Sequence, residues 1–281
     1  MWIKAGVSHI DSSTPFAQVK RVLGELLLRA PEVRVPEWQS LDVADKPQGI
    51  THELQNVVFS SPIPESDDWD EDLLKEEGVS WPWAEEQFQD RVSGLPFNPP
   101  PSAATWPYTQ HDHKDVTDED KQFSHTYPER MWPQYAPFSK DGKRLAHTVN
   151  WGIRYRFGDL NDLVDQLAKS PMTRQAFLPI WFPEDTGAVD GQRVPCSLGY
   201  HFLIRDGGLS VAYFIRSVDF IRHFPDDVYM AMRLGQWVRD RLEDIWGDTV
   251  LGMDTLTMHI VSLHIFGGDM PKMERLYGQA E

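Results

Sequence analysis

The sequence is poor in cysteine and in positive charge. Its 281 residues include a single cysteine, Cys196, so no disulfide can form within the chain and an oxidising compartment offers this fold no gain. Lys and Arg number 27 against 43 Asp and Glu, which gives a formal net charge of −16. A general nucleic-acid binder needs a positive surface, so this balance argues against one and confines any phosphate site to a local group of arginines.

Long apolar runs and the common ligand-binding loops are also missing. The longest apolar runs, such as AFLPIWF, fall far short of the roughly 20 residues that cross a membrane. The N-terminal MWIKAGVSHIDSS lacks the apolar segment of a secretory signal. Neither GxGxxG nor GxxxxGK[ST] occurs, and one cysteine with scattered histidines lacks the close ligand pairs of a metal site. We expect a soluble, cytoplasmic protein without a metal, nucleic-acid or membrane partner.

Helical and strand-like apolar patterns alternate irregularly along the chain, which predicts a single α+β domain over residues 1–281. The pair Asp206-Gly207 between two apolar segments predicts a β-hairpin. Asp159 is the expected N-cap of a helix that ends at Pro171. The predicted helices span 15–30, 83–94, 159–170 and 226–246, and the predicted strands span 50–60, 176–182, the hairpin 199–216, and 256–266.

Two further patterns concern the surface and the core. Residues 62–90 contain eleven acids and one base, Lys75, a local net charge of −10, and we expect most of this stretch to be a solvated surface excursion. The long helix after Pro225 has a clear apolar stripe. Its expected inward residues are Met230, Leu234, Val238, Leu242 and Ile245.

Cys196 precedes the predicted hairpin, and Arg216 ends its second strand. Because a hairpin returns the end of its second strand to the start of its first, Arg216 should lie near the thiol. A nearby guanidinium lowers a thiol pKa and can bind phosphate. A buried structural thiol is the competing interpretation of Cys196. The acids at Asp226-Asp227 also suit a helix N-terminus without any catalytic role.

The segment PCSLGYHFLIRDGGLSVAYFIRSVDFIRHFPDDVYMA resembles the core of thymidylate synthases. That family has Pro-Cys, an aromatic hairpin around Asp-Gly, Arg-Ser-x-Asp, and then Pro and an Asn that lead a long helix. The resemblance extends to SPMTRQAFLPIW, SLHIF and TYPERMW, and so covers residues 127–270. It implies a three-layer fold with a central mixed sheet, and an obligate homodimer.

The resemblance also implies roles for individual residues. Cys196 would add to C6 of a pyrimidine 5′-monophosphate, and C5 would then attack the one-carbon unit of the co-substrate 5,10-methylenetetrahydrofolate. Glu86, or Glu85 beside it, would position catalytic water. The other implied contacts are Arg216 and Ser217 on the phosphate, Arg174 on the phosphate from the partner subunit, Asp219 near the folate or the base, His264 at the sugar, Tyr127 beside the nucleophile, and His201 where the family has a hairpin Gln.

Position 227 is the departure that bears on substrate choice. The uracil-specific enzymes of the family have Asn there, and its amide can pair with N3–H and O4 of uracil. A carboxylate at Asp227 accepts from N4–H of cytosine and, if N3 is protonated, from N3–H. Asp is what the cytidylate hydroxymethylases of the family show. The sequence therefore resembles that branch, in which water captures the exocyclic methylene and the product is a 5-hydroxymethylcytosine nucleotide.

Other departures leave the sugar and the pathway open. Gln175 replaces the second Arg of a pair, Ser197 replaces a His after the cysteine, and Phe266 replaces a sugar-binding Tyr. The altered sugar site favours CMP over dCMP, as in the similar mildiomycin-type hydroxymethylases, so antibiotic biosynthesis and phage DNA modification are both open. The alternatives are a thymidylate synthase or dUMP hydroxymethylase, a non-catalytic nucleotide-binding homologue, and a Cys-His hydrolase. Lys46 is a candidate for the family's N-terminal Arg, and Trp81, Trp83 and Trp106 are candidates for stacking on the pterin.

Overall fold

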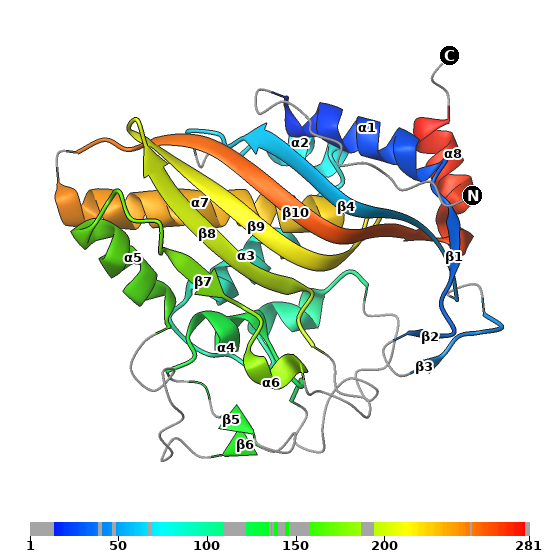
Figure 1. Ribbon diagram of the computed structural model, residues 1–281, viewed down its shortest axis with the longest axis horizontal. Coiled ribbons are helices and arrows are strands. Elements are labelled where there is room, and N and C mark those ends of the chain that lie inside the picture. The colour runs from blue at the N-terminus through cyan, green and yellow to red at the C-terminus, as the bar shows by residue number, and fades with distance from the viewer. Residues whose placement is uncertain are drawn as a thin grey trace.

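One mixed six-stranded sheet forms the centre of the molecule, as a computed structural model shows (Figure 1). Its spatial order is β1-β4-β10-β9-β8-β7, in which β9 and β10 are parallel and all other neighbours are antiparallel. The strands are β1 (Glu32–Arg34), β4 (Ile50–Pro62), β7 (Phe177–Pro179), β8 (Ser197–Arg205), β9 (Gly208–Asp219) and β10 (Gly252–Phe266). The structure describes residues 14–38, 41–46, 49–66, 69–108, 122–134, 136, 138–139, 144–145, 158–186, 194–247 and 249–278.

The predicted hairpin is confirmed as β8 and β9. Its two-residue turn holds Asp206 and Gly207 at φ of 49° and 79°, the left-handed pair that a tight hairpin needs and that Asp-Gly supplies at little cost. Inward-facing residues alternate along both strands, and their side chains are buried, among them Tyr200, Phe202, Tyr213 and Ile215. This hairpin brings the start of β8 beside the end of β9.

A long helix, α7 (Phe224–Trp246), connects β9 to its parallel neighbour β10. The predicted inward residues Met230, Leu234, Val238 and Leu242 are all buried. The prediction for Ile245 is wrong, because its side chain is 52% exposed in the last turn of the helix, where α7 passes beyond the sheet. The β9–α7–β10 unit places the first turn of α7 next to the end of β9.

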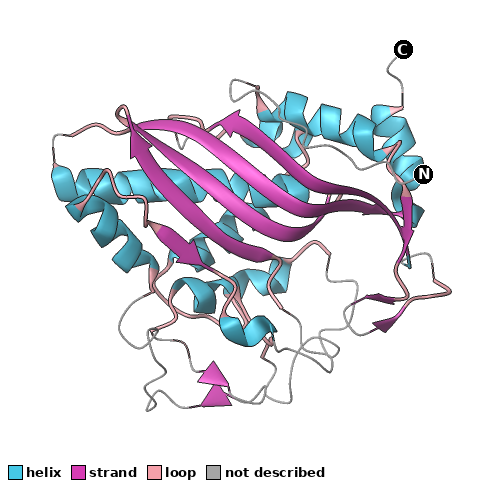
Figure 2. Ribbon diagram, in the orientation of Figure 1, coloured by secondary structure: helices cyan, strands magenta, loops and turns pink. Residues whose placement is uncertain are grey.

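Helices cover one face of the sheet (Figures 1 and 2). In the described part of the chain, these helices form a layer against that face of the sheet. The remaining helices are α1 (Phe16–Leu27), α2 (Glu71–Glu76), α3 (Trp83–Val92), α4 (Tyr127–Met131), α5 (Leu160–Lys169), α6 (Pro183–Thr186) and α8 (Met270–Tyr277), with 3-10 helices at Pro101–Thr105 and Gly267–Asp269. Two small strand pairs are β2 (Glu37–Trp38) with β3 (Leu41–Asp42), and β5 (Phe138–Ser139) with β6 (Arg144–Leu145).

Local signals account for several of these helices. The carboxylate of Asp162 accepts hydrogen bonds from the backbone N–H groups of Gly158 and Asp159 (2.9 and 3.1 Å), so α5 begins after Asp159 as predicted. Helix α3 ends before Gly94, whose φ of 82° stops the helix. Among the described residues, no helix is long and apolar enough to cross a bilayer.

The acidic stretch 62–90 is folded more tightly than we expected. Leu74 and Val79 are buried, and the indole N–H of Trp69 donates to the side-chain oxygen of Gln236 on α7 (3.1 Å). The backbone N–H of Ser80 donates to Oδ1 of Asp226 at the start of α7 (2.7 Å). Most of the acids still face solvent, but the stretch forms one wall beside α7.

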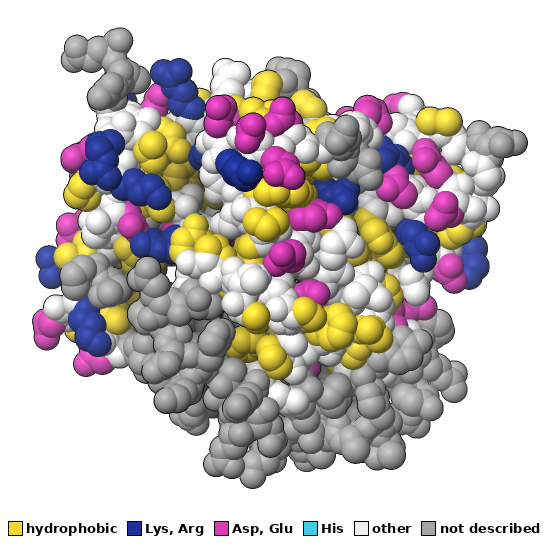
Figure 3. All heavy atoms as spheres, turned by 180° about the vertical axis from the view of Figure 1, so that it is seen from behind, with side chains coloured by type: hydrophobic (Ala, Val, Ile, Leu, Met, Phe, Trp, Pro, Cys, Tyr) yellow, Lys and Arg dark blue, Asp and Glu magenta, His cyan; other side chains and the backbone are white. Residues whose placement is uncertain are grey.

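Viewed from the helix side, the molecule shows basic and acidic side chains interspersed with apolar ones (Figure 3). Over the described part of this face, charges of both signs alternate and no large positive field builds up. The distribution agrees with the acidic composition in disfavouring a polyanion surface there.

Candidate functional site

The hairpin brings Cys196 and Arg216 together, as the sequence predicted. The backbone N–H of Arg216 donates to the carbonyl of Cys196 (2.9 Å). The guanidinium folds back over the residues before the cysteine, since Nε donates to the carbonyl of Pro195 (2.9 Å) and an Nη donates to that of Val194 (3.1 Å). Cys196 is half-buried. An arginine is thus fixed beside an accessible thiol by backbone contacts alone.

Behind the thiol lies a group of buried hydroxyls. Ser197 is fully buried, and its Oγ lies 3.1 Å from the hydroxyl of Tyr127 and 2.5 Å from that of Tyr213. The rings of Tyr213 and Tyr200 stack with centroids 4.3 Å apart. Burial raises the pKa of Tyr127, and the nearby Cys196 raises it further, so this phenol stays neutral and can donate a hydrogen bond. Tyr127 is thus bonded to Ser197, the residue that follows the thiol, and a role beside the nucleophile stays a prediction.

Asp227 lies in the first turn of α7 and faces the same group. Burial raises its pKa to about 7, the positive charge of Arg91 opposes that rise, and the neighbouring Asp226 adds to it. Asp227 also contributes to the raised pKa values of Tyr213 and Tyr127. No side chain in the described part of the chain donates a hydrogen bond to its carboxylate. This carboxyl can change its charge near neutral pH.

Arg91 was missed by sequence reasoning. It lies on α3, is 5% exposed, and its guanidinium carbon sits 4.0 Å from the centre of the Tyr127 ring. Its Nε is buried with no hydrogen-bond partner among the described residues. The signal was present, because Arg91 lies on the same helical face as the buried Ala84 and Phe88, where a charged residue is unusual.

Asp219 has a structural role in this structure. One oxygen accepts from the backbone N–H groups of Ile221 and Arg222 (2.9 and 3.1 Å), and the other pairs with the Arg222 guanidinium (2.9 Å). Arg222 also forms a two-bond ion pair with Asp269 before α8 (2.6 and 3.0 Å). This network fixes the turn from β9 into α7, so Asp219 acts on the site through the backbone that it holds.

Ser217 and His264 lie near the ends of the parallel strands β9 and β10. Ser217 pairs with Ser262, and His264 pairs with Asp219, in the register of the two strands. The carbonyl of His264 accepts from the N–H of Phe220 (2.9 Å). Burial lowers the pKa of His264, against the opposing effect of Asp219, so the ring is neutral at pH 7. Both residues share one end of the sheet with Arg216.

Arg174 and His201 are not in this group. Arg174 is exposed on the connection between α5 and β7, and its carbonyl lies 3.0 Å from Nε2 of His201. His201 is on the sheet face opposite the buried Tyr200 and Phe202, since side chains alternate along β8. Neither side chain reaches Cys196 within this chain.

The structure does not bring Glu86 to the cluster. Glu86 is exposed and accepts a hydrogen bond from Oγ1 of Thr105 (2.8 Å). Five residues separate it from Arg91, which turns it about 140° away around the helix. Glu85 is engaged elsewhere: burial would raise its pKa, but hydrogen bonds from Arg233 and Tyr229 of α7 lower it overall. Glu86 thus connects α3 to Thr105, and Glu85 connects α3 to α7.

Aromatic side chains gather around the start of α7. Trp106 stacks on His223 with ring centres 6.1 Å apart, and Tyr108 meets the same imidazole edge-on at 5.4 Å. Trp81 packs edge-on against Tyr229 (6.2 Å), and the Trp83 indole donates to a backbone carbonyl. Trp106 is only half-buried. Trp81 and Trp83 are half-buried too, so stacking of any of the three on a pterin stays a prediction.

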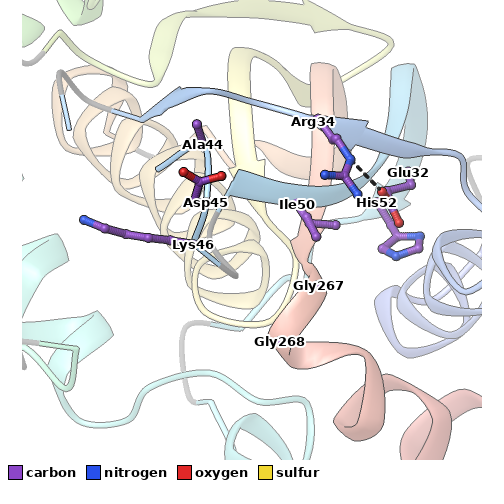
Figure 4. A pocket seen from close by; sticks show the side chains of 9 residues that line it. All are labelled: Glu32, Arg34, Ala44, Asp45, Lys46, Ile50, His52, Gly267 and Gly268. Atoms are coloured by element: carbon purple, nitrogen blue, oxygen red, sulfur yellow. Dashed lines mark ion pairs between the residues drawn. The ribbon is translucent and has the colours of Figure 1, made fainter. Parts of the chain in front are cut away.

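A separate pocket of about 640 Å³ lies where β1, β4 and the turn after β10 meet (Figure 4). Lys46 and Asp45 line one side of it, and Arg34 and Glu32 form an ion pair at 3.4 Å on another. Since Thr51 of β4 pairs with Phe266, the pocket adjoins the strand end that carries His264. Its walls carry charges of both signs, and a phosphate contact by Lys46 stays a prediction.

Comparison with known proteins relates the sequence to thymidylate synthases. No family model matches the chain. Over 135 residues it is 29% identical to a protein of Methanococcoides burtonii and 27% identical to one of Methanosarcina barkeri, both named "Putative thymidylate synthase". The match covers 48% of this chain and 56% of each relative, so the chain spans about half the length of the curated relatives it matches.

The fold comparison covers almost the whole chain. Thermostable thymidylate synthase A from Bacillus subtilis aligns with a TM-score of 0.61 and 15% sequence identity, over 95% of this chain and 85% of that one. The chain therefore has the thymidylate synthase fold, as the resemblance predicted. The sequence matches and the fold together support the thymidylate synthase superfamily.

Proposed function

We propose that the protein is a folate-dependent one-carbon transferase that acts on a pyrimidine 5′-monophosphate, and that the pyrimidine is cytosine. The observation that carries the proposal is the meeting of three elements: Cys196 at the start of β8, Arg216 at the end of β9, and Asp227 in the first turn of α7. The hairpin turn brings Arg216 to Cys196, and β9 leads within a few residues into the first turn of α7, which supports a common site. The relatives named thymidylate synthase support the reaction class.

Covalent activation is the task of Cys196 in this proposal. Its thiolate adds to C6 of the ring, which places an electron pair at C5, and C5 forms a bond to the methylene carbon of the folate co-substrate. Loss of the C5 proton and departure of tetrahydrofolate leave an exocyclic methylene. Water adds to that methylene, the thiolate leaves C6, and the product carries a 5-hydroxymethyl group. The buried Tyr127 hydroxyl is placed to donate a hydrogen bond beside the thiol.

Asp227 supports cytosine as the base. Its carboxylate accepts no hydrogen bond within the described chain and its pKa is about 7, so it can accept from the N4 amine of cytosine and share a proton with N3. Protonation at N3 makes C6 more electrophilic, which assists the attack by Cys196. For the sugar we propose ribose over deoxyribose, because Phe266 has no hydroxyl to donate at the position where the family has Tyr.

The phosphate is proposed to lie against Arg216 and Ser217, with Arg174 reaching it from a partner subunit. Arg174 is exposed and distant from its own Cys196 cluster, so it would serve the site of a second copy. The helix-free face of the sheet supports such a dimer. It carries Phe214, whose ring stacks on His259 at 4.7 Å, together with the 44% exposed Phe177 and the 50% exposed Val261.

A panel of CMP, dCMP, UMP and dUMP with 5,10-methylenetetrahydrofolate tests the reaction. We expect tritium release from C5-labelled CMP and a product heavier by one CH₂O unit, which mass spectrometry detects. Dihydrofolate should not accumulate, because only methyl synthesis uses the folate hydride. Turnover of dUMP with a rise in dihydrofolate absorbance would establish a thymidylate synthase instead. No turnover of any nucleotide, with binding retained, would favour a non-catalytic nucleotide-binding homologue.

The shared site has its own test. Cys196→Ser and Arg174→Ala should each be inactive as pure proteins. Mixing the two after reversible subunit exchange creates hybrid dimers in which one site has both an intact thiol and an intact partner arginine. Activity should return in the mixture, up to about a quarter of the wild-type rate for random exchange. Sedimentation at equal concentration supplies the control, and a monomer in solution would contradict the dimer.

A further inference from the structure

Arg91 is a buried cation whose contacts in the structure do not account for its charge. Its guanidinium lies over the Tyr127 ring at 4.0 Å, and its Nε has no hydrogen-bond partner among the described residues. A buried charged group without a hydrogen-bond or ion-pair partner lowers the stability of a fold. Such a group is therefore expected where its charge acts on another group in the site. Among the described residues, its one hydrogen bond to a side chain uses the backbone carbonyl, which accepts from the Trp132 indole (2.8 Å).

The ionisable groups that interact electrostatically with Asp227 come from five elements. They are Arg91 on α3, Asp226 on α7 itself, Tyr127 on α4, Tyr200 on β8 and Tyr213 on β9. Among these described groups, Arg91 is the one with a positive charge. It also lowers the pKa of Asp226, but burial has the larger effect there and raises that pKa to about 6. Asp226 is held by the N–H of Ser80 through Oδ1, while its buried Oδ2 has no described partner.

We propose that Arg91 is a positioning residue that sets the base preference by favouring the anionic form of the Asp227 carboxyl. The inference rests on the function proposed above. Arg91 sits on the inward face of α3, a helix joined to the first turns of α7 by the hydrogen bond from Tyr229 to Glu85 (2.6 Å), and Arg91 and Asp227 form no direct ion pair. A low-dielectric interior makes such an interaction strong.

The charge of Asp227 decides which pyrimidine it can pair with. The anion offers acceptors only, which match the N4 amine of cytosine and repel O4 of uracil. The neutral acid offers one O–H donor and one carbonyl acceptor, the pattern of an amide, which matches O4 and N3–H of uracil. Because the pKa of Asp227 is about 7 with Arg91 present, loss of that charge should leave the neutral acid in excess at neutral pH.

Two measurements test the inference, one of which needs no turnover. Carbon-13 NMR of Asp-labelled protein, with the Asp227 resonance assigned by its loss in Asp227→Asn, gives the titration midpoint directly. Removal of the charge in Arg91→Gln should raise that midpoint by about one pH unit, and the CMP-to-UMP ratio of kcat/KM at pH 7 should then fall about tenfold. Arg91→Lys should keep both values close to wild type.

Arg233→Gln is the matched control. Arg233 is also an arginine between α3 and α7, over the Phe88 ring at 5.0 Å, but it pairs with Glu85 and is not among the charges that act on Asp227. Should Arg91→Gln fail to fold, Arg91→Met keeps most of the side-chain volume and removes the same charge. An unchanged Asp227 midpoint in a folded neutral variant would overturn the inference whatever the enzyme turns over. A raised midpoint in a protein that accepts no pyrimidine nucleotide would instead overturn the proposed function.

Discussion

Asp219 and Asp227 stand eight positions apart, at the end of β9 and in the first turn of α7, yet the fold treats them in opposite ways. Asp219 accepts two backbone hydrogen bonds and an ion pair from Arg222. Asp227 accepts none from a described side chain, and burial raises its pKa to about 7. A carboxylate whose acceptors are satisfied by the protein holds a turn, whereas one left unsatisfied in a buried site is available to a ligand.

The largest expected effect is a loss of reaction rate without a loss of stability, in the proposed site that includes Asp227. Cys196→Ser should reduce C5 tritium release by at least about a thousandfold, because a hydroxyl is a far weaker nucleophile than a thiolate. The melting temperature should stay nearly unchanged, since the two side chains are similar in size. Residual activity above a tenth of wild type would contradict a covalent role for Cys196.

Asp219→Asn should show the reverse, a loss of stability. Replacing the carboxylate leaves Arg222 and Asp269 in an incomplete network, and we expect the free energy of unfolding to fall by about 2–3 kcal/mol. Urea denaturation followed by fluorescence measures it. Asp254→Asn, which removes a more exposed carboxylate bonded to Ser210 (2.6 Å), is the control and should cost less than about 1 kcal/mol. Equal losses of unfolding free energy in the two variants would contradict the structural role of Asp219.

Asp227→Asn should change the base preference. An amide can donate to O4 of uracil but can no longer serve as an anionic acceptor for the amine of cytosine. We expect kcat/KM for CMP to fall about tenfold to a hundredfold, which is the effect of losing one or two hydrogen bonds, and kcat/KM for UMP or dUMP to rise. Asp254→Asn provides the comparison, since Asp254 is exposed and bonded to Ser210, and should leave the ratio of the two bases within about threefold.

The stability of Asp227→Asn should also depend on pH differently from that of the wild-type protein. The pKa of Asp227 in the folded protein is about 7, above its ordinary value of 3.8, so between these pH values the folded state holds a proton that the unfolded chain has lost. Ionisation therefore costs the folded protein stability as pH rises through this window. Asp227→Asn lacks that cost, which is about 4 kcal/mol for this shift, and its melting temperature should exceed the wild-type value by about 10 °C near pH 8.

The pH series includes its own control. Below about pH 4 the wild-type carboxyl is protonated in both states, so the difference between the two proteins should vanish there. A constant difference from acid to alkaline pH would show that the substitution acts through packing and that Asp227 is not a buried titrating group.

Glu86→Gln should have the smallest effect. Because Glu86 is exposed and bonded to Thr105, we expect kcat to change by less than about twofold. If Glu86 positions catalytic water, as the resemblance implied, the loss should instead reach at least about a hundredfold. A steady-state assay with CMP and the folate distinguishes these outcomes.

Local patterns made much of the fold predictable. The Asp206-Gly207 turn, the apolar stripe of α7 and the Asp159 cap each depend on a few adjacent residues, and all three are confirmed. Hairpin geometry alone brought Arg216 to Cys196. The prediction failed for Ile245, since periodicity assigns a face to a residue but does not say where the covering sheet ends.

The sequence alone determined which reactive groups are available: one thiol, an arginine at the far end of the hairpin that follows it, and a carboxylate in the first turn of a long helix. These follow from spacing, because turns and helices act over short distances. Only tertiary packing decided how each group behaves. It turned Arg91 inward and Glu86 outward on the same helix, and satisfied Asp219 while leaving Asp227 without a donor. The ionisation of a side chain depends on desolvation and charges contributed by other elements, and no adjacent residue can specify those.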